Sequence, residues 1–465
     1  MRQSAMRIML LAFLAAITLT TSAKRKREPF PGGKCWLYRV SLSDKNGTPY
    51  SIKKPSKYLS AKAIERRERQ HLAIDSTDLP INPAYIKGIS KAGFQIVSKS
   101  KWNNTVVVRV QDTTSIAKLK ALPYVCSTRR VFTSPDSVAA PSRHVIQTDT
   151  TKADPNKYYG RADAQISTLN GKFLHEAGFK GKGMTIAVID GGFMNLDSLE
   201  LLSNVNILGT RNFVYPDTKS VYGELDHGTA VLSTMAANLP GRIVGTAPEA
   251  AYWLLRSEYG ETESESEEDF WAAAAEFADS VGVDVINSSL GYNEFYDKST
   301  SHTYRQLDGH TAQITKAAAR LASKGIILTN SAGNDGAKTW KKISFPADAD
   351  GILTVGAMRP DSINTIFSSV GPTADGRVKP DVMAIGSPCA AITGFGLIFW
   401  VSGTSFSSPI TCGMVACLWQ ALPHLTATEI MNLIRRSSDR AAYPDNIYGY
   451  GIPDFGKAYL EGKRL

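Results

Sequence analysis

Apolar and polar positions follow two different patterns along the chain, and the longer pattern begins near residue 184. Short continuous apolar runs recur at 184–189, 252–255, 283–286, 325–328 and 352–355. Stretches with helical periodicity lie between them, for example 271–281 and 314–323. Short buried strands that alternate with helices predict an α/β fold, with a parallel sheet flanked by helices. Functional groups in such a fold gather beyond the carboxyl ends of the strands.

The region before it predicts a small, separate α+β domain. Residues 34–50 read as a strand followed by an Asn-Gly turn, and 106–110 form a β-branched run typical of another strand. Helical patterns cover 58–73, 84–92 and 115–122. From 132 to about 157 the chain is rich in Ser, Thr, Asp, Pro and Ala without periodicity, which indicates a linker. We therefore expect a first domain at 24–150, a linker to about 159, and a second domain at 160–465.

The first residues have the pattern of a targeting segment. Arg2 and Arg7 precede an apolar run at 8–19, and Thr21-Ser22-Ala23 supplies small residues for cleavage. This predicts a signal peptide at 1–23 and export to the periplasm, cell surface or medium. The basic residues at 24–27 oppose translocation, so a membrane tether through an uncleaved signal anchor is the alternative. No later segment is apolar for long enough to predict a membrane span.

Charge separates the two predicted domains. The chain carries a net charge of +10, with +15 on residues 24–150 and −7 on residues 151–465. A basic segment suits nucleic acid, a membrane surface, or docking on an acidic module. Export disfavours nucleic acid.

The five cysteines do not form a disulfide scaffold, since an odd number cannot all pair within one chain. A bridge between Cys35 and Cys126 is one candidate. Cys412 and Cys417 lie five residues apart on one predicted helix and point to different faces, so we expect them to be small buried apolar residues.

Four polar residues stand at positions where chemistry is expected. Asp190 ends an apolar strand and precedes two glycines, His227 begins a helical stretch, Asn334 lies in a glycine-rich loop, and Ser405 lies near the start of a helix with Pro409 in its first turn. Each alone has an ordinary structural explanation, such as a turn or a helix cap. Together, in this order, they supply an orienting acid, a general base, an oxyanion donor and a nucleophile.

Six motifs carry a family resemblance over about residues 160–465. They are IAVIDGG (186–192), DHGTAV (226–231), VINSSLG (285–291), SAGNDG (331–336), FSSVGPTADGRVKPDV (367–382) and SGTSFSSP (402–409). In these motifs the chain resembles the subtilisin-like serine peptidases. The resemblance implies an endopeptidase that hydrolyses peptide bonds through an acyl-enzyme, with Asp190, His227 and Ser405 as the triad and Asn334 as the oxyanion donor.

The same resemblance implies how substrate is held. Ser289, Leu290 and Gly291 match the segment that pairs with an extended polypeptide substrate and walls its primary pocket. The chain departs from the usual pattern at four positions: Tyr292 replaces Gly, Ser344 replaces Gly, Ile385 replaces Pro and Phe406 replaces Met. None of these positions belongs to the triad, so we expect the differences to alter specificity rather than chemistry.

In similar enzymes a small N-terminal domain acts as an intramolecular chaperone and inhibitor and is then removed. The resemblance therefore implies two partners, polypeptide substrates and the chain's own propeptide, and the opposite charges of the two domains fit that docking. It implies no cofactor for catalysis. The loops lack the ligand spacing of a dedicated calcium site, so we assign no metal ligand.

An acidic run at 261–269 adds a hypothesis about specificity. By resemblance it borders the subsites upstream of the scissile bond, where it would favour basic substrate residues. The alternative is structural, because acidic residues also favour helix N-termini and solvated loops.

Three rival functions make different demands on the sequence. A catalytically silent module that binds proteins would lack a triad residue. An acid-acting relative would use Glu and Asp in place of His227. An esterase of the α/β-hydrolase type would show Gly-x-Ser-x-Gly and the order Ser, Asp, His.

Overall fold

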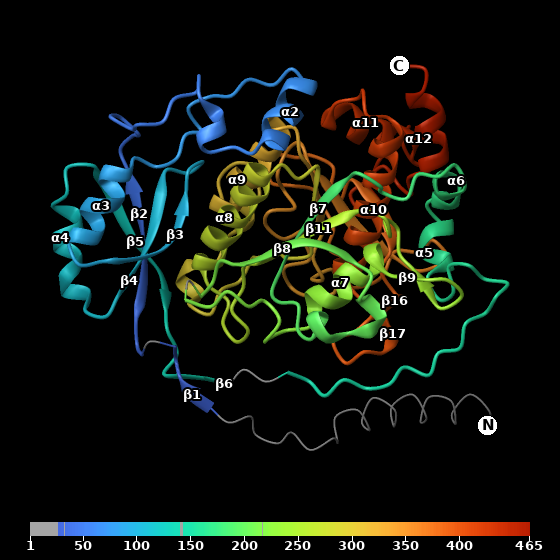
Figure 1. Cartoon of the computed structure of the whole chain (residues 1–465), viewed down its shortest axis with the longest axis horizontal. Coiled ribbons are helices and arrows are strands. Elements are labelled where there is room, and N and C mark those ends of the chain that lie inside the picture. Colours follow the sequence, from blue (N-terminus) through green and yellow to red (C-terminus); the bar gives the residue numbers. More distant parts are fainter. Residues whose placement is uncertain (1–26, 32, 140–142, 216) are drawn as a thin grey trace.

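The computed structural model describes residues 27–31, 33–139, 143–215 and 217–465 (Figure 1). The predicted signal peptide at 1–23 lies outside these residues. Within the described part of the chain, no helix is both long and apolar enough to cross a membrane.

A seven-stranded parallel sheet forms the centre of the larger domain. Its strands, in spatial order, are β15 (Val382–Ile385), β14 (Leu353–Met358), β13 (Ile327–Ser331), β12 (Val285–Ser288), β7 (Thr185–Asp190), β11 (Ala251–Arg256) and β8 (Asn206–Asn212). All neighbouring pairs are parallel. The five predicted strands are confirmed, each within a few residues. Edge strand β8 escaped prediction because it is polar and half exposed, without an apolar run.

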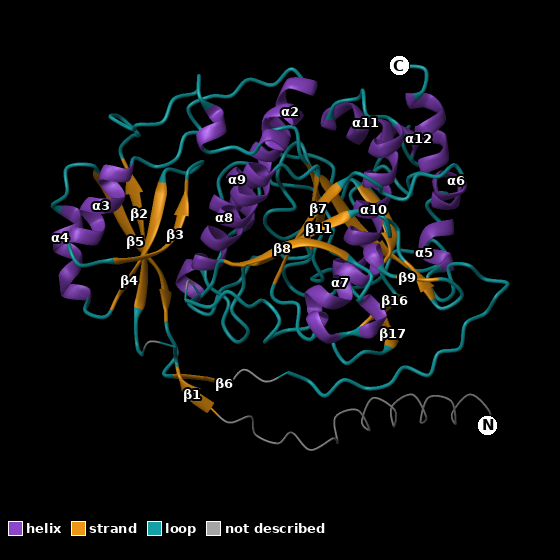
Figure 2. Cartoon of the chain, viewed as in Figure 1, coloured by secondary structure: helices purple, strands orange, loops and turns teal. Residues whose placement is uncertain are grey.

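Helices cover both faces of this sheet, and β7 shows why. Its residues Ile186 and Val188 pack on one side with α7 (His227–Ala236) and α10 (Thr404–Ala421). Ala187 and Ile189 pack on the other side with α8 (Glu265–Val281) and α9 (Gln313–Ser323). Because successive side chains of a strand point to opposite faces, a fully apolar strand serves both layers. Figure 2 shows the layers, which confirm the predicted fold class.

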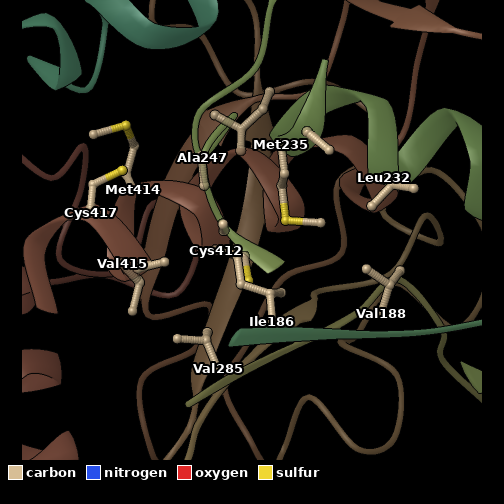
Figure 3. Close-up of a cluster of buried hydrophobic side chains, with 14 of the residues drawn as sticks. Ile186, Val188, Leu232, Met235, Ala247, Val285, Cys412, Met414, Val415 and Cys417 are labelled. Carbon is tan, nitrogen blue, oxygen red and sulfur yellow. The ribbon is translucent and has the colours of Figure 1, made fainter. Parts of the chain in front are cut away.

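The core between the sheet, α7 and α10 contains two of the predicted buried cysteines. Both lie on α10 without exposure to solvent: Cys412 is near Ile186, Val285 and Met235, and Cys417 is beside Met414 (Figure 3). Their prediction as small apolar residues is confirmed.

Shorter elements complete this domain. They are α5 (Asp163–Ser167), α6 (Gly171–Glu176), α11 (Ala427–Ser437) and α12 (Phe455–Gly462), and the hairpins β9 (Asn238–Leu239) with β10 (Ile243–Val244) and β16 (Cys389–Ile392) with β17 (Ile398–Val401).

The N-terminal domain is an antiparallel sheet with helices, as predicted. Its strands lie in the order β3 (Gln95–Ser100), β4 (Thr105–Val110), β2 (Trp36–Leu42) and β5 (Val125–Thr133). The helices α3 (Pro83–Lys91) and α4 (Ile116–Lys120) share one small core with this sheet. The sheet packs against α8, through β3 and β5 (Figure 1).

Helix α2 (Ala61–Arg69) belongs to the insertion between β2 and α3. It lies above α8 and α9 in Figure 1, apart from the four-stranded sheet. Two short strands, β1 (Arg27–Pro29) and β6 (Ser137–Ala139), pair at the opposite side of the domain.

The candidate disulfide between Cys35 and Cys126 is wrong, since all five cysteines are free thiols. Cys35 is buried beside Trp36, which pairs with Thr133 at the end of β5. Cys126 is exposed next to Val125, which pairs with Leu42 at the start of β5. The antiparallel register thus places the two cysteines at opposite ends of the same strand pair.

The predicted linker is partly ordered on the catalytic surface. The His144 ring stacks on Phe395 with 4.0 Å between centroids, and the Asn195 side chain donates to the His144 carbonyl at 2.8 Å. Asp149 then accepts from Arg242 at 2.7 Å and from the backbone of Ile398 at 2.8 Å. This segment runs along the bottom of the view in Figure 1 toward α5.

Candidate active site

Two of the predicted catalytic residues are in direct contact. Asp190 ends β7 and is fully buried, and His227 is the first residue of α7. Nδ1 of His227 lies 2.9 Å from Oδ1 and 3.1 Å from Oδ2 of Asp190. Gly228 permits this approach, because a Cβ there would lie 2.5 Å from the Gly192 carbonyl oxygen and 3.0 Å from the Asp190 Cβ. The pair orients the imidazole and fixes which nitrogen faces the carboxylate.

The surroundings of His227 act on its pKa in opposite directions. Burial disfavours the protonated ring, but the charge and hydrogen bond of Asp190 outweigh it, with smaller contributions from Glu258 and Asp226. The pKa of His227 is raised to about 9. The position at a helix N-terminus favours the neutral ring, and the adjacent carboxylates override that effect.

Ser405 lies at the start of α10, which begins at Thr404 after Gly403. The helix start is as predicted, but Pro409 lies in the second turn rather than the first. A proline there leaves the carbonyl four residues earlier without its helical donor. That carbonyl belongs to Ser405, and the Ser289 hydroxyl donates to it at 2.7 Å. The segment predicted to bind substrate and the turn that carries Ser405 are therefore linked by a hydrogen bond.

Asn334 is held with its amide nitrogen available. Its Oδ1 accepts from both the backbone N–H and the hydroxyl of Thr404, at 3.0 Å each. The Thr404 hydroxyl in turn accepts from the Gly333 backbone at 3.2 Å. Because the carbonyl oxygen is engaged, Nδ2 is the group that can donate to a ligand.

One cavity of about 380 Å³ brings the predicted site residues together. Its lining includes Asp190, His227, Ser289, Leu290, Gly291, Asn334 and Ser405. The ring of His227 lies 5.9 Å, centroid to centroid, from that of Phe406, the residue after Ser405. Side chains that are 215 residues apart in the sequence thus share one wall of the cavity, at the carboxyl edge of the sheet.

Comparison with known proteins agrees with this geometry. Residues 181–451 match the peptidase S8 family model, described as the subtilase family.

The chain belongs to the subtilase family.

Residues 37–149 match a second model, the peptidase S8 propeptide domain of Bacteroidota. The protein is therefore a serine-type endopeptidase, a hydrolase, with a propeptide domain. The predicted boundaries at residues 23, 150 and 160 stay predictions.

Individual relatives are similar over the same region. Subtilisin NAT from Bacillus subtilis subsp. natto is 28% identical over 288 residues, which cover 62% of this chain and 68% of that protein. Serine protease AprX from Bacillus subtilis (strain 168) is 30% identical over 303 residues, covering 58% of this chain and 65% of the relative. The crystal structure of MycP1 with the N-terminal propeptide removed shares the fold, with a TM-score of 0.51 and 21% identity over 64% of this chain and 96% of that one.

The rival functions considered above fail for this subtilase. Asp190, His227 and Ser405 are all present at the cavity, so the mark of a catalytically silent module is missing. The family match and the chain order Asp190, His227, Ser405 also separate the chain from an α/β-hydrolase esterase.

Two acidic residues of the cavity extend what the sequence predicted. Glu258 and Glu263 line the same wall as His227 and Ser405. Glu258 accepts from the Tyr292 hydroxyl at 2.8 Å, and burial together with the charge of Glu263 raises its pKa to about 8. Burial also raises the pKa of Glu263. Glu258 lay outside the predicted acidic run, but it follows β11 by two residues, so the rule that found Asp190 could have found it.

The acidic run itself serves mainly as an interface. Its second half forms the first turn of α8, capped by Ser264 and Glu267. Glu265 pairs with Arg129 at 2.8 Å and Asp269 with Arg39 at 2.7 Å, both from the propeptide domain. The structural alternative thus holds for most of the run, and Glu263 is its member at the cavity.

Two of the departures lie at or next to the cavity: Ser344 lines it, and Tyr292 follows Gly291, which also lines it. Tyr292 and Phe345 exchange two backbone hydrogen bonds, at 2.8 and 2.9 Å. A Cβ added at Gly291 would lie 2.8 Å from the Ser344 Cβ, and one added at Gly333 would lie 2.6 Å from the Ser344 Oγ. Ser344 therefore lies between the segments that follow β12 and β13.

The described residues contain no group of three or more His, Cys, Asp or Glu side chains arranged to hold a metal ion.

Proposed function

We propose that Ser405, His227, Asp190 and Asn334 carry out the peptidase reaction of this subtilase. The observation that supports the assignment is the shared cavity, together with the 2.9 Å contact of His227 and Asp190. His227 removes the proton from the Ser405 hydroxyl as the oxygen attacks the scissile carbonyl, and Asp190 stabilises the imidazolium that forms. His227 then protonates the leaving amine, and water hydrolyses the acyl-enzyme by the same route.

The developing oxyanion is stabilised by two kinds of donor. The side-chain amide of Asn334 is one, since Thr404 already occupies its oxygen. The backbone N–H groups at the start of α10 are the other, in the positive end of a helix dipole. All these steps use groups of the chain itself, so we propose that catalysis requires no cofactor.

Polypeptide substrates bind along Ser289-Leu290-Gly291 as an added strand. We propose that this cleft prefers a basic residue upstream of the scissile bond. Within the described residues, Glu258 and Glu263 form no ion pair with a cation, whereas Asp335 in the same cavity pairs with Lys338 at 2.7 Å. A cationic substrate side chain would relieve the unfavourable burial of these two carboxyl groups.

The propeptide domain keeps the enzyme inactive until it is removed. Ala139 donates its backbone N–H to Glu261 at 2.9 Å, close to the wall that holds Glu263. Arg143 pairs with Asp197 at 2.9 Å, beyond His227 and near the Gly394 loop. These contacts hold the chain against the catalytic domain at Ala139 and Arg143, and we keep the predicted end of the propeptide at residue 150. We also propose export, from the basic and apolar pattern of residues 1–23.

One experiment tests the assignment. The chain from residue 24 is expressed as wild type, Ser405→Ala and Ser402→Ala, and each product is assayed on a general protein substrate and sequenced at its N-terminus. Ser402 is a matched control because its hydroxyl contacts only Ser387 among the described residues. We expect Ser405→Ala alone to stay uncleaved and inactive. Normal maturation and activity in that variant would overturn the proposal.

A further inference from the structure

Helix α2 occupies a second contact between the propeptide domain and the catalytic domain, away from the cleft. It lies at the C-terminal ends of α8 and α9, which face the amino edge of the parallel sheet, whereas Ser405 lies at the carboxyl edge. The backbone N–H of Ser60, the N-cap of α2, donates to the Ser280 carbonyl of α8 at 2.9 Å. The residues between β2 and α3, which include α2, add no strand to the four-stranded sheet, so strand pairing in that sheet does not position this helix.

Arg66 binds the carbonyls at the ends of both helices. Its guanidinium donates to the carbonyls of Val283 at 2.7 Å and Lys324 at 3.0 Å, and to the Asp279 carboxylate at 2.6 Å. Both Arg66 and Asp279 are almost wholly buried, with side chains 1% and 0% exposed. A cation is stabilised there because unpaired carbonyls make a helix C-terminus negative.

Arg67 shares the same carboxylate. Its Nη2 lies 2.8 Å from Asp279 and 2.7 Å from Asp78 of the propeptide domain. The adjacent cations, Lys101 included, hold the pKa of Asp279 below its usual range despite burial, which would raise it. One buried carboxylate of the catalytic domain thus receives two neighbouring arginines.

Contacts in the reverse direction complete the site. Lys324 of the catalytic domain reaches Asp78 at 2.9 Å and Asp75 at 3.3 Å. The Gln70 side chain donates to the Gly325 carbonyl at 2.9 Å and accepts from the Ala427 backbone, at the start of α11, at 2.8 Å. The catalytic domain therefore presents a contact surface that matches a short helix with two adjacent arginines and a glutamine, together with the loop that carries Asp75 and Asp78.

We propose that this contact surface is a docking site for α2 that acts independently of the cleft and sets how long the cleaved propeptide stays bound. The proposal rests on inhibition by the propeptide, as argued above. Once the propeptide is cut from the catalytic domain, only non-covalent contacts retain it. Loss of one partner of a buried ion cluster is unfavourable because it leaves the other charge unpaired, so this contact resists partial release. Activity begins when it opens.

The test uses the full chain from residue 24, with wild type compared to Arg66→Gln/Arg67→Gln. After cleavage, the retained propeptide is followed by co-elution on a sizing column and by the delay before activity appears. We expect cleavage at the wild-type junction and release at least about tenfold faster. Arg129→Gln is the matched control, since it removes a propeptide arginine whose side chain is 59% exposed, and we expect a less than about threefold change.

Asp279→Asn tests the catalytic side of the same contact. It keeps the shape of the residue, removes the shared charge and lies outside the cleft, so kcat/KM of the propeptide-free enzyme is expected to stay unchanged while release accelerates. In the triple variant the effects of the two sides should not add, because they remove one interaction. Release at the wild-type rate in both the arginine double variant and Asp279→Asn would overturn the proposal.

Folding failure does not leave the question open. If the arginine double variant yields no soluble chain, Gln70→Ala decides, because it removes two hydrogen bonds without leaving a charge unpaired. Faster release in Gln70→Ala supports the anchor, and wild-type release refutes it. A wild-type chain that is active while still bound to its propeptide would instead refute the proposed inhibition, which keeps the two failures distinguishable.

Discussion

The two domains of this subtilase differ in what they bury: the catalytic domain buries mainly apolar side chains, whereas the propeptide domain also buries charged side chains at its contact with the catalytic domain. The catalytic domain buries both faces of its parallel sheet under its own helices, through apolar side chains such as those of β7. The propeptide domain covers one face of its sheet with α3 and α4 and places the other face on α8. Its basic residues Arg39, Arg66 and Arg67 are buried against carboxylates of the catalytic domain, and Arg67 also pairs with Asp78 of its own domain.

This difference teaches where each domain is vulnerable. Most of the packing inside the catalytic domain is between its own residues, with Trp102 of the propeptide domain added to one cluster, so damage at the site should affect mainly the chemistry. The propeptide docks through buried ion pairs and through an apolar contact, in which Phe132 stacks on Tyr259 with 4.8 Å between ring centroids, so damage there should affect timing and release. Four predictions test this difference between the two domains.

Asp190→Asn should produce the largest effect, a loss of about 10⁴-fold in kcat, the size known for such a change in a serine peptidase triad. The amide keeps the volume but favours the wrong tautomer of His227, whose Nδ1 now contacts the carboxylate at 2.9 Å. Steady-state kinetics of the mature enzyme measures it. Asp197→Asn, at a surface pair with Arg143, is the control and should retain full activity.

Asn334→Ala should lower kcat by about 10²–10³-fold, as removal of an oxyanion donor does in serine peptidases. KM should change little, because the donor acts on the charge that develops in the transition state. Asn293→Ala is the comparison, since Asn293 lines the same cavity and donates to Asp335 at 2.7 Å. A drop confined to KM in Asn334→Ala would contradict the role.

High salt should accelerate release of the cleaved propeptide by several-fold, up to about tenfold between 0.05 and 0.5 M NaCl. Exposed pairs such as Arg129–Glu265 and Arg27–Glu261 are screened, whereas the buried Arg39–Asp269 pair is screened much less. Sizing-column retention across a salt series measures the effect. In Arg129→Gln the salt dependence should become shallower, and an unchanged slope would count against the electrostatic account.

Glu258→Gln should produce the smallest of the four effects, a shift of about half a pH unit in the acid limb of the pH profile of kcat/KM. The Glu258 carboxylate raises the pKa of His227, so its removal lowers that pKa and the neutral base persists to lower pH. The limb therefore moves toward lower pH. The same variant should lose preference for basic upstream residues in peptide-library profiling, and a limb that moves toward higher pH would be evidence against this electrostatic contact.

The parts predicted from sequence share a physical property. Strand β7, the turn after Asp190 and the start of α10 depend on local chemistry, namely an apolar run, glycines that permit close approach, and a helix start. The four candidate catalytic residues could be proposed because strand ends and helix starts are recognisable along the chain, and because their motifs resemble those of one family.

Other features depended on contacts that local chemistry does not encode. The register of β2 against β5 separates Cys35 from Cys126, and no spacing could reveal it. The missing helical donor at Pro409 is replaced by Ser289, from a different strand end. Arg66 and Arg67 lie in the helix predicted at 58–73, where no local pattern indicates burial, and Asp279, more than 200 residues later, makes their burial favourable.

The fold class, the serine-peptidase chemistry and the opposite charges of the two domains could all be inferred from the sequence, because each is a property of local pattern or of composition. Only the tertiary structure decided which charges are paired. Ion pairing depends on the distance between side chains and on the removal of water around them, and both arise only when remote segments pack. For this reason the acidic run proved to be mainly a docking surface, and Glu258, outside the run, joined the cleft.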